Sequence, residues 1–122
     1  MSRLFAVALL GLATVANAID RLPAEAARIE YLLAVVASLH DAQFIRNGTA
    51  YDSSAAVKHM RAKLSLAGSR VKTAEDFIRY CGSQSSVSGK PYEIRFADGR
   101  VVPSAEFLQQ ALIDFDRASG RL

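Results

Sequence analysis

The stretch Phe44-Ile45-Arg46-Asn47-Gly48-Thr49-Ala50-Tyr51 joins two short β-favouring runs through an Asn-Gly pair. Asn and Gly readily adopt the positive φ angles of a two-residue type I′ turn, so this stretch predicts a β-hairpin. The segment Tyr92–Phe96 alternates apolar and polar residues, and an Asp98-Gly99 pair follows it, which predicts a second hairpin with residues 100–102. We therefore expect four short antiparallel strands.

Amphipathic helical patterns surround the two hairpins, with apolar residues recurring at three- and four-residue spacing. The four expected helices cover about 23–41, 55–67, 74–81 and 105–118. Thr73 with Asp76 resembles a capping box, Gly68 suits the end of the second helix, and Ser104 is expected to cap the last one. His40 is expected in the last turn of the first helix, where the helix dipole favours a cation. The fold class is a small α+β domain in the order helix, hairpin, helix, helix, hairpin, helix.

The first eighteen residues are typical of a secretory signal peptide. Arg3 precedes an apolar run from Leu4 to Val15, and Ala16-Asn17-Ala18 is a small-residue exit. The run is about a dozen residues, shorter than the roughly twenty that span a bilayer. We expect cleavage after Ala18, a periplasmic location and a single mature domain of residues 19–122, with no transmembrane segment.

Positive charge is concentrated in the middle of the chain. Residues 46–100 hold ten Lys or Arg against five Asp or Glu, whereas both flanking segments are acidic. This excess is either an ordinary solvated surface or a face that meets an anion. In an exported protein we expect lipid headgroups, lipopolysaccharide or cell-wall polymers rather than nucleic acid. The single cysteine, Cys81, allows no internal disulfide; it is expected to be a small buried hydrophobe, with an intermolecular disulfide or reactive thiol as the alternative.

Several segments together resemble the YfeK-like family, a domain of unknown function. They are Phe44–Gly48, Ala56–Leu64, Thr73–Ile78 and Ser83–Tyr92. The resemblance runs from about Ile29 to Leu112 and implies a small exported protein, mostly from Gram-negative bacteria. It implies no assigned activity and brings no catalytic residues to carry over.

The best functional candidate is a cationic edge rather than a motif. Arg46 and Tyr51 flank the first turn, and His59 and Lys63 lie four residues apart on one edge of the second helix. The expected patch also takes residues from that helix, the next loop and the segment before the second hairpin, namely Arg61, Arg70, Lys72 and Lys90. Such a patch with a tyrosine suits phosphate, carboxylate or sulfate. The alternative is that Arg46 and Lys63 pair with carboxylates such as Glu75 or Asp76.

The polar segment Ser83–Lys90 is a second candidate. Ser88, Gly89 and Lys90 could help to cradle an anion through backbone N–H groups, although the segment lacks the P-loop spacing. The alternative is a hydrogen-bonded loop between a helix and a strand. A nucleophilic Ser88 with His59 or Lys90 as base is conceivable, but no G-x-S-x-G elbow occurs. No metal-ligand pattern is present, and no cofactor is expected.

The sequence thus predicts a non-enzymatic binding or interaction module for an anionic envelope component or an acidic protein. The alternative is a small hydrolase or transferase acting on an envelope polymer, with Ser88, His59 and a carboxylate in its site. An enzyme needs polar groups that converge in a concave pocket, whereas a binding module needs only a basic surface or groove. A chaperone-like factor would instead expose a large apolar patch, against which the narrow helix stripes argue. The sequence leaves the oligomeric state open.

Overall fold

The protein was analysed as a computed structural model in which residues 21–122 are described; the predicted signal peptide lies outside them. This part of the chain forms four helices, one 3₁₀ turn and four strands. In chain order they are α2 (Pro23–Ser38), β1 (Gln43–Arg46), β2 (Thr49–Tyr51), α3 (Ser53–Ala67), η1 (Gly68–Arg70), α4 (Ala74–Cys81), β3 (Glu93–Arg95), β4 (Val101–Pro103) and α5 (Ser104–Ala118). The predicted α+β class, with two hairpins among helices, is confirmed.

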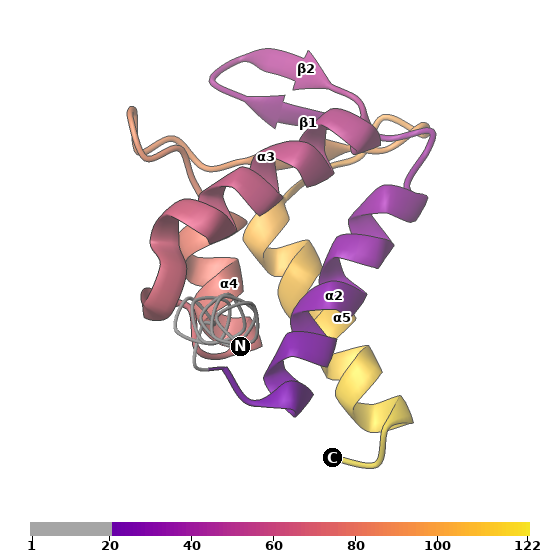
Figure 1. The fold of residues 1–122 in the computed structure, drawn as a ribbon. Coiled ribbons are helices and arrows are strands. Elements are labelled where there is room, and N and C mark those ends of the chain that lie inside the picture. Colours follow the sequence, from indigo (N-terminus) through magenta and orange to yellow (C-terminus); the bar gives the residue numbers. More distant parts are fainter. Residues whose placement is uncertain (1–20) are drawn as a thin grey trace, which may run out of the picture.

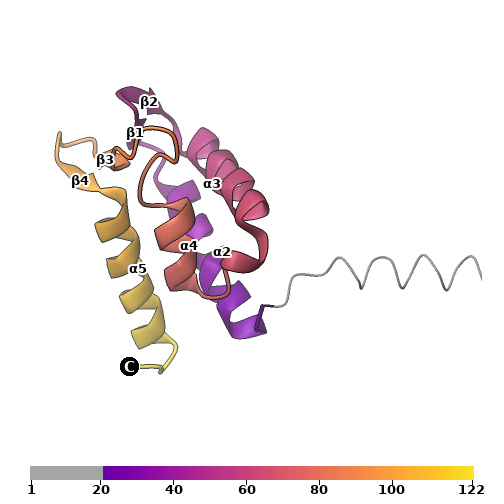
Figure 2. The same ribbon diagram turned by 90° about the vertical axis from the view of Figure 1, so that its left-hand side faces the viewer.

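The two hairpins join into one antiparallel sheet with strand order β2-β1-β3-β4. Asn47 and Gly48 take φ angles of 51° and 79°, as the type I′ turn requires. The β3–β4 loop is longer than two residues, because Arg95 pairs with Val101 and the Gly99 N–H donates to the Phe96 carbonyl. The sheet lies over one end of the helices, with α3 running beneath the β1–β2 hairpin (Figures 1 and 2).

The core fills the space between the four helices and the inner face of the sheet. Its fully buried side chains include Leu32 on α2, Phe77 on α4, Ile94 on β3 and Leu108 on α5. Cys81 is also fully buried, as expected, and burial raises the pKa of its thiol to about 11. A thiol of that kind is held protonated and behaves as a small hydrophobe. Within residues 21–122, no helix has the length and apolar character needed to cross a membrane.

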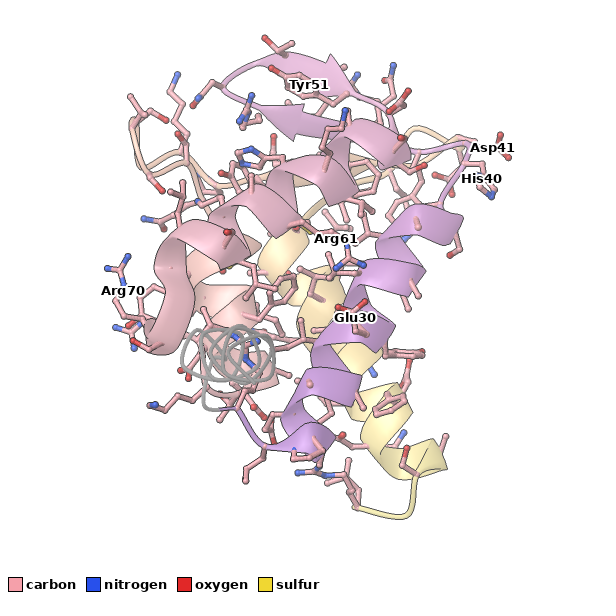
Figure 3. The ribbon with its side chains drawn as sticks, viewed as in Figure 1. Glu30, His40, Asp41, Tyr51, Arg61 and Arg70 are labelled. Carbon is pink, nitrogen blue, oxygen red and sulfur yellow. The ribbon has the colours of Figure 1, made fainter. Side chains whose placement is uncertain are left out.

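The helix ends confirm two of the predicted caps and correct two other predictions. Thr73 and Asp76 form the capping box, and Gly68 follows α3 with a φ of 56°. His40 was expected inside the first helix, but α2 ends at Ser38, and His40 lies in the exposed turn that follows (Figure 3). Because His40 is outside the helix, the dipole argument does not apply to it.

Ser104 was expected to cap α5, and this prediction is wrong. The helix begins at Ser104 itself, and the preceding Pro103, still paired with Glu93 in the sheet, holds the N-cap position without a side-chain hydrogen bond. Because α5 begins as soon as β4 ends, Ser104 lies inside the first turn, where its side chain cannot reach back as a cap. Its hydroxyl is buried instead.

A buried arginine ties three helices together. Arg28 on α2 is 4% exposed and donates to carboxylates of Glu25 (2.8 Å), Glu75 (2.9 and 3.0 Å) and Asp116 (2.7 and 3.0 Å). Glu25 also accepts from the Ala74 N–H at the start of α4. We call Arg28 and its three carboxylates the Arg28 cluster. All five of its guanidinium donors face acceptors, which is the condition for burying a charge.

Candidate functional site

The sheet register brings an arginine and two tyrosines onto one face. Phe44 pairs with Tyr51 on β2 and with Ile94 on β3, so these three side chains point the same way, toward the core. Side chains alternate along a strand, so Arg46 shares this face with Phe44. The β1–β3 register continued by one residue places Arg46 opposite Tyr92. Arg46 and Tyr92 therefore lie at the end of β1 nearest the Asn-Gly turn, and Tyr51 lies on the same face, diagonally across from Arg46 on β2.

Helix α3 supplies the other two side chains, His59 and Lys63. They lie on the same side of the helix because they are four positions apart. Arg46 Nη1 lies 2.8 Å from His59 Nδ1, and Arg46 Nη2 donates to Tyr51 Oη at 3.1 Å. His59 Nε2 lies 3.0 Å from Tyr92 Oη, to which Lys63 Nζ also donates at 3.2 Å. We call these five residues, which come from three strands or strand ends and one helix, the Arg46 cluster.

The hydrogen-bond roles in the Arg46 cluster follow from chemistry. Arginine can only donate, so Nδ1 of a neutral His59 accepts, and Nε2 then carries the hydrogen and donates to Tyr92 Oη. Tyr92 Oη thus accepts twice, and Tyr51 Oη accepts once. Neither phenolic hydrogen has an acceptor among the described residues. The cluster therefore presents more donors than acceptors.

The electrostatics of the cluster agree with a neutral His59. Burial, together with the nearby Arg46 and Lys63 charges, lowers the pKa of His59. Within residues 21–122 no carboxylate forms an ion pair with Arg46 or Lys63. The pairing with Glu75 or Asp76 that sequence analysis left as the alternative is not observed. Glu75 is bound to Arg28 and Asp76 caps α4.

The other cations of the expected patch do not join the Arg46 cluster. Arg61 is bound to Glu30 on α2 at 2.9 and 3.1 Å, and Figure 3 shows this pair between the two helices. Arg70 projects near the far end of α3 and lies over the ring of Tyr80. Lys72 and Lys90 are exposed, and no ion pair is observed for either among residues 21–122. The predicted patch is therefore smaller than expected.

The Ser-rich segment forms a hydrogen-bonded loop. Ser85 Oγ accepts from Asn47 Nδ2 and from the Val87 and Ser88 N–H groups, while the Ser88 hydroxyl donates to Asn47 Oδ1. Gly89 has a φ of 74°, which favours glycine. Ser88 is thus engaged with the β1–β2 turn, and no hydrogen bond joins it to His59 in the described structure. The loop also supplies the Gln84 carbonyl, which accepts from Lys63 Nζ at 3.1 Å.

Tyr92 is the member of the cluster that sequence reasoning missed. Its alternation with Ile94 and Phe96 indicated only a strand face. The pairing of β1 with β3 brings Tyr92 next to Arg46. No local sequence signal predicts that pairing. Among residues 21–122, no group of three His, Cys, Asp or Glu side chains is arranged to hold a metal ion.

A cavity of about 280 Å³ lies between α3 and the sheet, and Arg46, Tyr51, His59 and Tyr92 all line it. A larger groove of about 570 Å³ between α4 and α5 is bordered by Glu75 and Asp116, two carboxylates that bind Arg28, and by Arg79, which lies over the ring of Tyr80. The smaller cavity differs in having Arg46, with its histidine and tyrosine partners, in its wall.

Comparison with known proteins gives a family match and a curated relative, neither of which carries an assigned activity. Residues 23–116 match a family of unknown function, DUF5329. The uncharacterized protein YfeK of Salmonella typhimurium is 46% identical over 68 residues, which are 56% of this chain and 57% of that relative. The match thus spans little more than half of the relative's length. No solved structure matches the chain.

Proposed function

The chain belongs to the DUF5329 family, and we propose that this member is an exported, non-enzymatic module that binds an anionic group at the Arg46 cluster. The membership confirms the resemblance to YfeK-like proteins predicted from residues 44–92. The proposed compartment is the periplasm, where the ligand is an anionic envelope component or an acidic partner. The compartment rests on the signal-like residues 1–18.

One observation carries the binding proposal: the cluster has two cations, two unused phenolic hydrogens and no carboxylate within hydrogen-bond distance among the described residues. Cations that are fully buried in proteins are almost always paired with an acid, as Arg28 is here, whereas the part-buried Arg46 has no acid partner in the described structure. A phosphate or carboxylate oxygen offers the acceptors that Arg46, Tyr51 and Tyr92 lack. Arginine in particular binds such groups through two parallel hydrogen bonds.

The enzymatic alternative has no comparable observation in its favour. It needs Ser88 activated by His59, yet Ser88 is bonded to Asn47 and His59 to Arg46 and Tyr92. A cluster with more donors than acceptors suits the recognition of an anion. We therefore propose binding alone.

The test is isothermal titration calorimetry of the mature chain, residues 19–122, with inorganic phosphate, acetate, a muropeptide and lipopolysaccharide. Arg46→Gln is compared with Arg95→Gln, which removes an equal charge from an exposed strand position. We expect binding of at least one anion, weakened about tenfold or more by Arg46→Gln and unchanged by Arg95→Gln. Raising salt from 50 to 500 mM should weaken it as well.

Two outcomes would contradict the proposal. One is the absence of heat with every anion at millimolar concentration; the other is equal weakening by both substitutions. Export is tested separately by the N-terminal sequence of the protein recovered from the periplasm. It should begin at Ile19, and recovery of the uncleaved chain from the cytoplasm would overturn the proposed location.

A further inference from the structure

The cavity beside the Arg46 cluster is apolar away from that cluster. Its walls there include Phe44 from the sheet and Ala55, Ala56 and Met60 from α3. The polar residues of its lining are Arg46 with its hydrogen-bond partners, together with Lys58, Glu93 and Ser104. The cavity therefore has two chemical parts, one suited to a charge and one suited to hydrocarbon.

Small side chains on α3 explain why the space is open. Alanines at positions 55, 56 and 62 line the cavity on the helix side, across from the larger Phe44 and Tyr51. Well-packed interiors leave few voids larger than a water molecule. A volume of about 280 Å³ instead approaches the ~300 Å³ at which ligand pockets begin.

Ser104 borders the same cavity. The residue is 1% exposed, and its hydroxyl has no hydrogen-bond partner among residues 21–122. A buried hydroxyl without a partner is costly and is rare in native proteins. Because solvent does not reach this hydroxyl, a molecule in the cavity does not contact it without a local rearrangement.

We propose that the ligand of the Arg46 cluster is a small amphiphile, with one acidic headgroup on Arg46 and an apolar chain in the cavity between α3 and the sheet. This inference rests on the proposed function and adds the ligand class to it. The headgroup is a carboxylate or a phosphate monoester, because both present the acceptor oxygens that Arg46 and the tyrosines require. The apolar walls exclude a purely polar ligand from the inner part.

The first test is a chain-length series of acetate, butyrate, hexanoate and octanoate, titrated calorimetrically into residues 19–122. Octyl phosphate is compared with inorganic phosphate in the same way, which separates the two headgroups. Each added methylene that enters the cavity should tighten binding about threefold to fourfold. The gain should stop when the cavity is full.

The second test fills the cavity. Ala55→Leu places a larger side chain at the cavity wall, and Ala34→Leu on the exposed side of α2 is the matched control. We expect Ala55→Leu to keep acetate binding and to lose the chain-length gain, while Ala34→Leu keeps both. Circular dichroism establishes that each variant is folded. A further measurement needs no substitution: NMR contacts between the octanoate chain and the Met60 methyl group should show that the chain lies in the cavity.

The outcomes separate this inference from the proposed function. If short anions bind and added methylenes bring no gain, the amphiphile is overturned and anion binding stands. A gain that survives Ala55→Leu, without contacts to Met60, overturns the cavity as the chain site. If neither anions nor amphiphiles bind, both proposals fail.

Discussion

Two arginines, Arg28 buried on α2 and Arg46 part-buried at the end of β1, have opposite hydrogen-bond partners. Arg28 is bound to three carboxylates from three helices, whereas Arg46 is bound to a histidine and a tyrosine. The first cluster joins α2, α4 and the C-terminal part of α5, the end of the helices away from the sheet (Figure 1). The second joins the sheet to α3. The difference teaches that one cation is held by acids within the fold and the other is not, and the proposal that Arg46 binds an anion rests on this contrast.

The largest effect should come from removing the compensated arginine. Arg28→Met leaves Glu25 and Asp116 buried without their main cation, and we expect it to lower the free energy of unfolding by about 3–5 kcal/mol. Arg46→Met breaks no ion pair observed in the described structure, and its effect should be about 1 kcal/mol or less. Urea denaturation of both variants measures this. Equal losses would show that the Arg46 cluster is also structural.

Acid should act on the Arg28 cluster in a predictable direction. Hydrogen bonds from Arg28 lower the pKa of Asp116 and of Glu75, so each carboxylate stabilises the folded state above its ordinary pKa, near 4. This stability is lost as pH falls through the lowered values of the folded protein. Denaturation at pH 6, 4.5 and 3 should show the decrease. In Arg28→Met the sign should reverse, because protonation then removes an uncompensated buried charge.

At the Arg46 cluster, a change of pH should alter the affinity for an anion rather than the stability of the fold. Burial, Arg46 and Lys63 lower the pKa of His59, so the free protein keeps it neutral down to pH values below 6.5. A bound anion opposes those two charges and favours the imidazolium. We expect acetate, which keeps its single negative charge over this range, to bind about fivefold more tightly at pH 5.5 than at pH 8, in line with one added charge at close range. His59→Gln should abolish this gain, and an unchanged pH profile in that variant would remove His59 from the site.

The smallest effect should be that of Ser104→Ala. The substitution removes a buried hydroxyl that has no partner in the described structure. The unfolding free energy of the unliganded protein should therefore stay the same or rise by up to about 1 kcal/mol. Ser53→Ala is a comparison at a buried serine at the start of another helix. A loss of more than 1 kcal/mol in Ser104→Ala would mean that the hydroxyl has a partner.

Local signals predicted the elements well. The Asn47-Gly48 turn, the Thr73–Asp76 capping box and the apolar stripes of the helices each depend on residues a few positions apart. The errors fell at junctions. Ser104 resembled a cap only because β4 was expected to end before Pro103. His40 continued the apolar spacing of the first helix, but α2 ends at Ser38.

The sequence by itself determined the α+β class, the presence of two hairpins, the family and four of the five residues of the Arg46 cluster. His59 and Lys63 were recognisable because helical spacing places them on one edge, and Arg46 and Tyr51 because they flank one turn. These relations are short-range. The backbone geometry of one helix or one hairpin is enough to establish them.

Only the tertiary structure decided which charges are compensated. Arg28 meets Asp116 across 88 positions of the chain, and His59 meets Tyr92 across 33, through packing and strand pairing that no local pattern encodes. The same long-range pairing left Arg46 without an acid among the described residues and left a cavity beside it. Which side chains form ion pairs and hydrogen bonds with one another depends on which surfaces are buried together, and that is a property of the whole fold.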